Sequence, residues 1–189
     1  MKVTKIISLL VVLSVALLFV GCGEVPQAEI DAAKSALDAA KSAEADRYVP
    51  DQYNAAKKAL DNAMAVVKEE ESGMFSNYDE AVVQLQNVKS QAEQAAAAVP
   101  AKKEEIKGEI DGLLAQIPAL VKETKMMWKK APRGKGTHEP LQLIKKDIED
   151  TEASASEVTA AAEQGDLLAA RQKAQEIINK LKKLQSELQ

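Results

Sequence analysis

The stretch NYDEAVVQLQNVKSQAEQAAAAV, residues 77–99, places apolar side chains at alternating intervals of three and four residues. That spacing is typical of an amphipathic α-helix, because residues three and four apart lie on the same helix face. Asn77 followed by Glu80 is typical of an N-cap and capping-box pair. The stretch therefore predicts a long helix with one apolar stripe, which consists of Tyr78, Ala81, Leu85, Val88, Ala92, Ala95 and Val99.

The same spacing recurs along the rest of the chain and predicts about six helices after residue 24. The first spans about residues 25–46, Pro50 opens the second, Gly73 follows its end, and Gly165 separates the last two. The stripes of these helices are Ile30, Ala33, Leu37 and Ala40; Tyr53, Ala56, Leu60, Ala63 and Val67; Ile106, Ile110, Leu113, Ile117 and Leu120; Leu141, Ile144, Ile148, Thr151, Ala155, Val158 and Ala162; and Leu167, Ala170, Ala174, Ile177, Leu181, Leu184 and Leu188. No run alternates β-branched and aromatic residues with a period of two. The predicted fold is all-α, with amphipathic helical hairpins that form an elongated bundle or a coiled-coil-like array.

Two helical segments are expected within this fold. The stripe that follows Pro100 is out of phase with the one before it, so Pro100 is predicted to begin or kink a helix, and Pro118 is predicted to add a second kink. Residues 27–99 would form an alanine-rich helical domain, and residues 100–189 a second helical segment packed on the first. A diverged repeat at an offset of 88 to 89 residues is one interpretation, and the shared periodicity of all amphipathic helices is the other.

The N-terminus has the pattern of a secretory signal. Two lysines precede an apolar run over residues 6–20. That run is shorter than the about 20 apolar residues of a membrane-spanning helix. The stretch LFVGC, residues 18–22, resembles the lipobox of bacterial lipoproteins, although the motif prefers Leu where this chain has Phe19.

The lipobox resemblance implies that the Cys22 thiol receives a diacylglyceride, that residues 1–21 are cleaved, and that the new amino terminus is acylated. Residues 22–26 would then form the lipidated end and a short tether. Gly23, rather than Asp, after the cysteine implies the outer membrane, facing the periplasm; in an organism with one membrane, the protein would lie on its outside. An ordinary cleaved signal with a free thiol, or an uncleaved anchor, stays open.

The stretches AEADRYVPDQYNAAKKALDNA, residues 43–63, and NYDEAVVQLQNVKSQAEQA, residues 77–95, resemble a helical domain of unknown function found in bacterial envelope lipoproteins. The positions that match the family pattern are Tyr48, Pro50, Tyr78 and Ala81. The resemblance covers residues 27–98 and implies no catalytic residues. Some family members carry a peptidoglycan-binding domain after this module. Here the following segment is predicted to be more helix, so peptidoglycan binding is not carried over.

Composition argues against catalysis and against metal or cofactor binding. His138 is the only histidine and Cys22 the only cysteine, so multi-histidine metal sites are excluded. His138 is the only ordinary base for a serine nucleophile, and it is expected to be a solvated loop histidine. No serine lies in a Gly-x-Ser-x-Gly elbow, and the chain has no glycine-rich phosphate loop. The net charge is −4 and would become more negative without the two signal lysines, which disfavours nucleic acid as a partner.

A basic segment, KETKMMWKKAPRGKGTH at residues 122–138, stands out in this acidic chain. It predicts a contact with lipid headgroups, lipopolysaccharide phosphates or an acidic partner. The candidate contact residues are Trp128, Lys129, Lys130, Arg133 and Lys135. The other interpretation is a helix C-terminus whose cations complement the helix dipole, with Met127 and Trp128 packed into the bundle.

These features together predict a non-enzymatic, lipid-anchored protein of the cell envelope. It would bind the membrane through its acyl chains and act as a structural or protein-interaction module with a protein partner in the envelope. A different class stays open, a periplasmic carrier that holds an apolar ligand or lipid between its helices. The lining of such a carrier would be Leu113, Ile117, Leu120, Met127 and Ile148.

Overall fold

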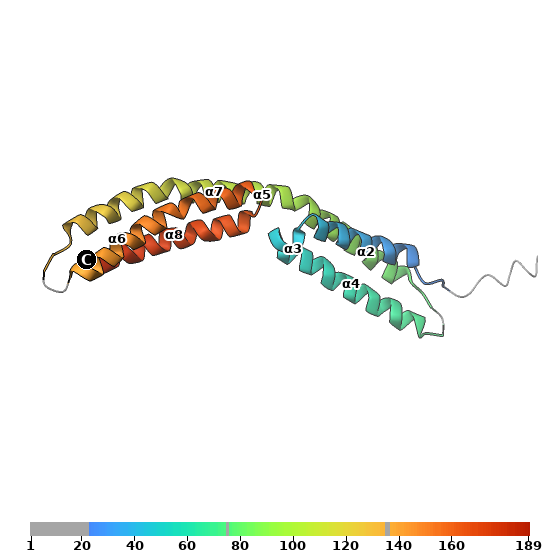
Figure 1. Cartoon of the computed structure of the whole chain (residues 1–189). Helices are drawn as coiled ribbons and strands as arrows, with labels where there is room; N and C mark the ends of the chain where they lie inside the picture. Colours follow the sequence, from blue (N-terminus) through green and yellow to red (C-terminus); the bar gives the residue numbers. More distant parts are fainter. Residues whose placement is uncertain (1–22, 75, 135–136) are drawn as a thin grey trace, which may run out of the picture. The chain divides into compact units, whose positions relative to one another are not determined.

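The computed structural model describes residues 23–74, 76–134 and 137–189, which form helices and no strand. The helices are α2 (Gln27–Ser42), α3 (Ala45–Tyr48), α4 (Pro50–Glu71), α5 (Asp79–Lys130), α6 (His138–Ala153), α7 (Ala155–Glu163) and α8 (Leu167–Glu187), as labelled in Figure 1. The predicted all-α fold is confirmed. Contacts within the chain define two compact units, unit 1 up to Val99 and unit 2 from Pro100 onward.

Unit 1 consists of α2, α3, α4 and the part of α5 up to Val99. α2 packs on α3 and α4, and Ala28 and Ala32 of α2 share a shallow groove with Leu85 of α5. The stripe predicted for residues 78–99 is buried at all seven positions, and so are the four predicted positions of α2. Many of these buried residues are alanines, so the helices can approach one another closely.

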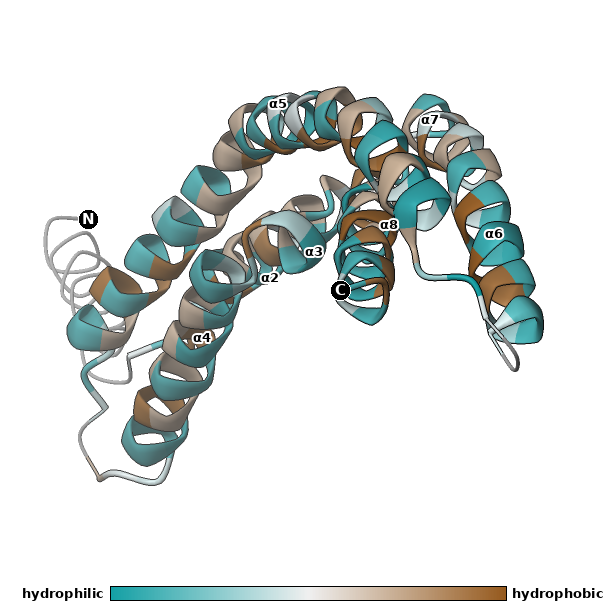
Figure 2. Ribbon diagram, turned by 90° about the vertical axis from the view of Figure 1, so that its left-hand side faces the viewer, coloured by the Kyte–Doolittle hydropathy of each residue, from teal (hydrophilic) through white to brown (hydrophobic). Residues whose placement is uncertain are grey.

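Unit 2 consists of the rest of α5 with α6, α7 and α8. α8 packs on α6 and α7, and Arg171 of α8 pairs with Glu109 of α5 at 3.0 Å. Larger side chains fill this unit. Those buried on α8 are Leu167, Ala170, Ala174, Ile177, Ile178, Leu181 and Leu184. Figure 2 shows apolar segments alternating with polar ones along α4, α6 and α8, as expected of amphipathic helices.

The prediction that Pro100 begins a helix is wrong. α5 continues from Asp79 to Lys130 through both Pro100 and Pro118, so two predicted helices are one. A proline inside a helix loses a backbone hydrogen bond and costs about 3 kcal/mol. The neighbouring alanines, lysines and glutamates are strong helix formers, and Val99 and Ile106 are buried on either side of Pro100. These contributions offset the cost of the proline.

Two other predicted helices are interrupted. The first ends at Ser42, because Glu44 takes a left-handed conformation with φ 65° before the short helix α3. The helix predicted after Pro140 is divided at Ser154 into α6 and α7. The Ser154 hydroxyl donates to the Asp150 carbonyl at 2.9 Å, a local hydrogen bond that competes with regular helix geometry.

The predicted cap of residues 77–99 is only partly as expected. The Asn77 side-chain oxygen accepts a hydrogen bond from the Asp79 N–H at 3.0 Å, as a capping residue should. The Asn77 N–H, however, donates to the Glu70 carboxylate at 2.8 Å, while Glu80 accepts from Gln84. The carboxylate that completes the cap therefore comes from the end of α4, which ties the two helices together through their turn.

Candidate functional site

The basic segment at the end of α5 surrounds a half-buried indole. The Trp128 N–H donates to the Leu141 carbonyl of α6 at 2.7 Å, which fixes the ring against that helix. The Arg133 guanidinium lies 5.1 Å from the ring centroid, and the Lys145 ammonium lies 6.0 Å from it. Both distances are within the range of a cation–π interaction. The structure thus brings predicted residues Trp128 and Arg133 together.

Charge on this surface is only partly neutralised. Lys125 pairs with Glu152 across α5 and α6, and Lys145 lies 3.6 Å from Glu149. Within the described ranges, Lys129, Lys130 and Arg133 form no ion pair with a carboxylate, although Arg133 contacts the indole. Lys135 lies outside the described residues. The Trp128 surface, which we define as Trp128, Lys129, Lys130 and Arg133, therefore presents uncompensated positive charge.

Lys145 also lies over the indole ring of Trp128, a contact that the sequence does not indicate. It lies on α6, seventeen positions after Trp128, and reaches the ring because the Leu141 carbonyl holds the indole one turn away. No local spacing signals a contact between two helices joined by a loop. Trp128 and the two lysines after Ile144 are both evident in the sequence. Their contact, however, depends on how α5 packs on α6.

A shallow apolar hollow lies beside the indole, with a volume of about 130 Å³. Its lining residues are Lys125, Trp128, Lys129, Lys145, Ile148 and Glu149. Sites for small molecules usually occupy about 300–1,000 Å³. Ile148 is the one residue that this hollow shares with the lining predicted for a carrier.

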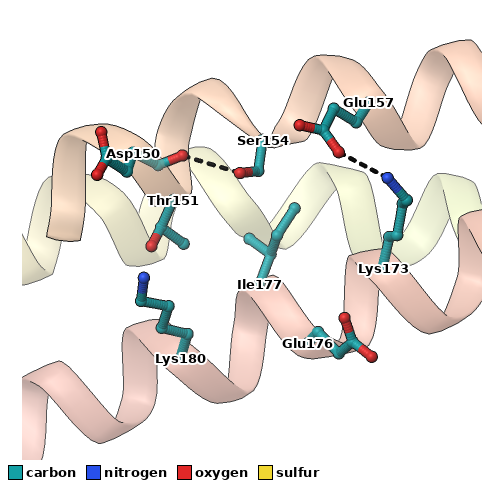
Figure 3. Close-up of a pocket in the computed structure, with 8 residues that line it drawn as sticks. All are labelled: Asp150, Thr151, Ser154, Glu157, Lys173, Glu176, Ile177 and Lys180. Atoms are coloured by element: carbon teal, nitrogen blue, oxygen red, sulfur yellow. Dashed lines mark hydrogen bonds and ion pairs between the residues drawn. The ribbon is translucent and has the colours of Figure 1, made fainter.

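A larger groove of about 250 Å³ lies between α8 and the junction of α6 with α7 (Figure 3). Charged side chains of both signs border it. Glu157 of α7 accepts a hydrogen bond from Lys173 of α8 at 2.6 Å, and Asp147 pairs with Lys180 at 3.1 Å. The Lys173 hydrogen bond and charge lower the pKa of Glu157 below its ordinary value. These pairs join α8 to α7 and α6.

The groove has no activated nucleophile. The Ser154 hydroxyl donates to the Asp150 carbonyl, as the dashed line in Figure 3 shows. His138 is exposed at the other end of α6, about 24 Å away along a helix that rises 1.5 Å per residue. A general base must lie within hydrogen-bond reach of the proton that it removes. Among the described residues, no group of three or more His, Cys, Asp or Glu side chains is placed to hold a metal ion.

The predicted lipid attachment residue, Cys22, lies outside the described residues, but the next residue is well placed in unit 1. A Cβ on Gly23 would lie 2.7 Å from the Ser76 carbonyl oxygen and 3.2 Å from the Tyr78 ring. Pro26 is buried, and its carbonyl accepts from the Ile30 N–H at 3.0 Å. The segment from residue 23 therefore packs directly on the turn between α4 and α5.

Comparison with known proteins gives no relative: no family model, curated protein or solved structure matches this chain. The resemblances to the lipobox and to the envelope helical domain accordingly stay predictions. Within the described ranges, none of the helices combines the length and apolar character needed to cross a membrane.

Proposed function

We propose that the protein is a non-enzymatic, lipid-anchored component of the bacterial cell envelope that acts as a structural or protein-interaction module. The observation that carries the proposal is the close packing of Gly23 on the turn between α4 and α5. Lipid on the preceding residue would join the folded unit with almost no tether, since consecutive Cα atoms are about 3.8 Å apart. Two or more acyl chains would hold the protein stably on a bilayer.

The two helical units support an interaction role better than a carrier role. Their cores consist of helix stripes that are already paired, and the apolar hollow beside Trp128 is about 130 Å³, less than a typical ligand site. The proposed location is the outer membrane, facing the periplasm, and the proposed partner is a second envelope protein. In the groove of Figure 3, the Ser154 hydroxyl donates to the Asp150 carbonyl and is not activated as a nucleophile.

Lipidation is tested first, by expressing the full chain and its Cys22→Ser variant in a diderm bacterium fed a clickable fatty acid. We expect label in the native chain alone, and a mature mass that corresponds to a chain beginning at Cys22 with its acyl groups. Sedimentation with outer-membrane fractions should depend on Cys22 in the same way. An unlabelled native chain, or equal labelling of both chains, would contradict the proposal.

The Trp128 surface supports a second, additional role as a contact for anionic groups. Lys129, Lys130 and Arg133 lack carboxylate partners in the described structure, and this carries the proposal. The test compares delipidated protein with a variant in which Lys129, Lys130, Arg133 and Lys135 are all Gln, on vesicles with and without anionic lipid. Binding that requires both anionic lipid and the basic residues supports the contact, whereas negligible binding of both proteins would exclude it for membranes.

A further inference from the structure

We propose that the apolar hollow beside Trp128 is the docking point for an acidic segment of a partner protein. This segment would insert one leucine-sized aliphatic side chain between α5 and α6 and place its carboxylates at Lys129. The inference rests on the proposed interaction role of the chain, and it names the chemistry of the partner. The residues that line the hollow all belong to these two helices and are Lys125, Trp128, Lys129, Lys145, Ile148 and Glu149.

The hollow is formed before a partner binds. The Trp128 N–H donates to the Leu141 carbonyl at 2.7 Å, which holds the ring against α6, and Ile148, 2% exposed, lines the base. The lining is mostly apolar, so the lysines contribute chiefly their methylene stems. A partner side chain would therefore meet an ordered surface, and binding would lose little free energy to its rearrangement.

The size of the hollow favours a single side chain. Its volume of about 130 Å³ is well below the about 300–1,000 Å³ of sites for small molecules. It holds roughly four water molecules at about 30 Å³ each, which is about the size of a leucine side chain. An apolar group that displaces poorly ordered water gains affinity. Protein interfaces obtain most of their affinity from a few such anchors in pockets, so one inserted side chain can dominate binding.

The charge at the rim favours acidic flanks on the partner. Lys129 is exposed and pairs with no carboxylate in the part of the chain that the structure describes. Lys125 and Lys145, by contrast, pair with Glu152 and Glu149. Carboxylates of an acidic segment would therefore form ion pairs at Lys129 that the free protein lacks. Complementary charge also speeds association and fixes the orientation of the partner.

The carboxylates beside the hollow favour a peptide over an anionic membrane. Glu149 and Glu152 are about half exposed, so a flat anionic surface that reached the lysines would also be repelled by these two residues. A peptide can place its acidic residues at Lys129 and avoid both. The hollow is therefore assigned to an acidic peptide segment, and recruitment of anionic lipid is the competing outcome.

The test uses the purified full chain in phosphatidylcholine vesicles, with its acyl groups checked by mass, and follows the emission of Trp128, the only tryptophan. The probe is the peptide Asp-Glu-Leu-Glu-Asp, which is titrated beside one version with Ala in place of Leu and another with Ser in place of the acidic residues. The protein variant is Lys129→Glu. Its matched control is Lys182→Glu on α8, an exposed lysine outside the hollow that changes the net charge equally.

We expect the Leu peptide to shift Trp128 emission to shorter wavelength, as water leaves the ring. It should bind about tenfold or more tightly than the Ala peptide, because a buried leucine side chain contributes far more than a methyl group. The Ser peptide should bind more weakly, and added salt should weaken the Leu peptide, because salt screens the ion pairs. Lys129→Glu should weaken binding by about threefold or more, whereas Lys182→Glu should have little effect.

Equal binding of the Leu and Ala peptides, equal effects of the two substitutions, or no response to any peptide would overturn the inference. A response of Trp128 to phosphatidylglycerol vesicles alone would assign the surface to lipid and overturn it as well. None of these results changes the acylation that is read by mass. Absence of acyl groups would instead contradict the proposed lipid anchor.

Discussion

Replacement of Leu181 by Ala should remove a large part of the stability of unit 2. Leu181 lies on α8 and is completely buried, so truncation removes its contacts and leaves a cavity. Leu→Ala substitutions in cores cost about 2–5 kcal/mol. A unit of about 90 residues has a free energy of unfolding of roughly 5–13 kcal/mol at 0.05–0.15 kcal/mol per residue. The expected loss is therefore large relative to the whole.

Trp128, the only tryptophan, lets fluorescence follow unit 2 selectively. Unfolding should break the indole hydrogen bond to Leu141 and expose the ring to water, so that its emission shifts to longer wavelength. At a urea dependence of about 1–3 kcal/mol per M, a loss of about 2–5 kcal/mol should lower the Leu181→Ala midpoint by roughly 0.7–5 M. The matched control is Leu143→Ala on α6, where the side chain is 62% exposed and the cost should be about 0.5 kcal/mol or less. Coincident midpoints for the two variants would refute the assigned burial of α8.

Three further changes have expected outcomes. Trp128→Phe should lower the free energy of unfolding by about 0.5–1.5 kcal/mol in calorimetry, because it deletes the indole hydrogen bond. Gly165→Ala should destabilise by about 1–2 kcal/mol because φ is +84°, whereas Gly108→Ala in open space on α5 should stabilise by about 0.5–1 kcal/mol; equal effects would contradict the left-handed turn. Lys173→Gln should raise the Glu157 pKa towards its ordinary value in an NMR titration, and an unchanged pKa would contradict the ion pair. Since this pKa is lowered in the folded protein, the pair stabilises above the ordinary carboxyl pKa, and its contribution is lost as the pH falls through the lowered value.

The buried faces of the helices were predictable, because burial in these helices follows the three- and four-residue spacing of apolar residues in the sequence. The stripe of residues 78–99 and that of α2 are buried at each predicted position. Helix ends were less predictable. Glu44 adopts a left-handed conformation, which a sequence indicates only where glycine or asparagine is present. Pro100 lies inside a helix because the helix-forming residues around it offset the free-energy cost of the proline.

The contacts around the candidate sites could not be predicted from the sequence, because they join residues of different structural elements. The sequence indicated the cations near Trp128, but not that Lys145 of the next helix lies over the ring or that Leu141 accepts its N–H. It also indicated a short tether after Cys22, but not that Gly23 packs on the turn at Ser76. In each case the partner is distant in sequence, and only the packing of the helices brings the groups together.

Two positions of the family resemblance, Tyr48 and Tyr78, are buried at turns of unit 1. Tyr48 is 3% exposed in α3, where the chain turns from α2 into α4, and Pro50 begins α4 with a proline in its first turn. Tyr78 is 7% exposed at the start of α5, where its ring lies against Gly23. The pattern thus marks the two turns of a helical unit, and one of these turns also receives the segment that follows the proposed lipid attachment site. The contact between Tyr78 and Gly23 therefore holds the segment before α2 against the end of unit 1, and under the proposed lipidation of Cys22 the same contact would place the anchor beside that end.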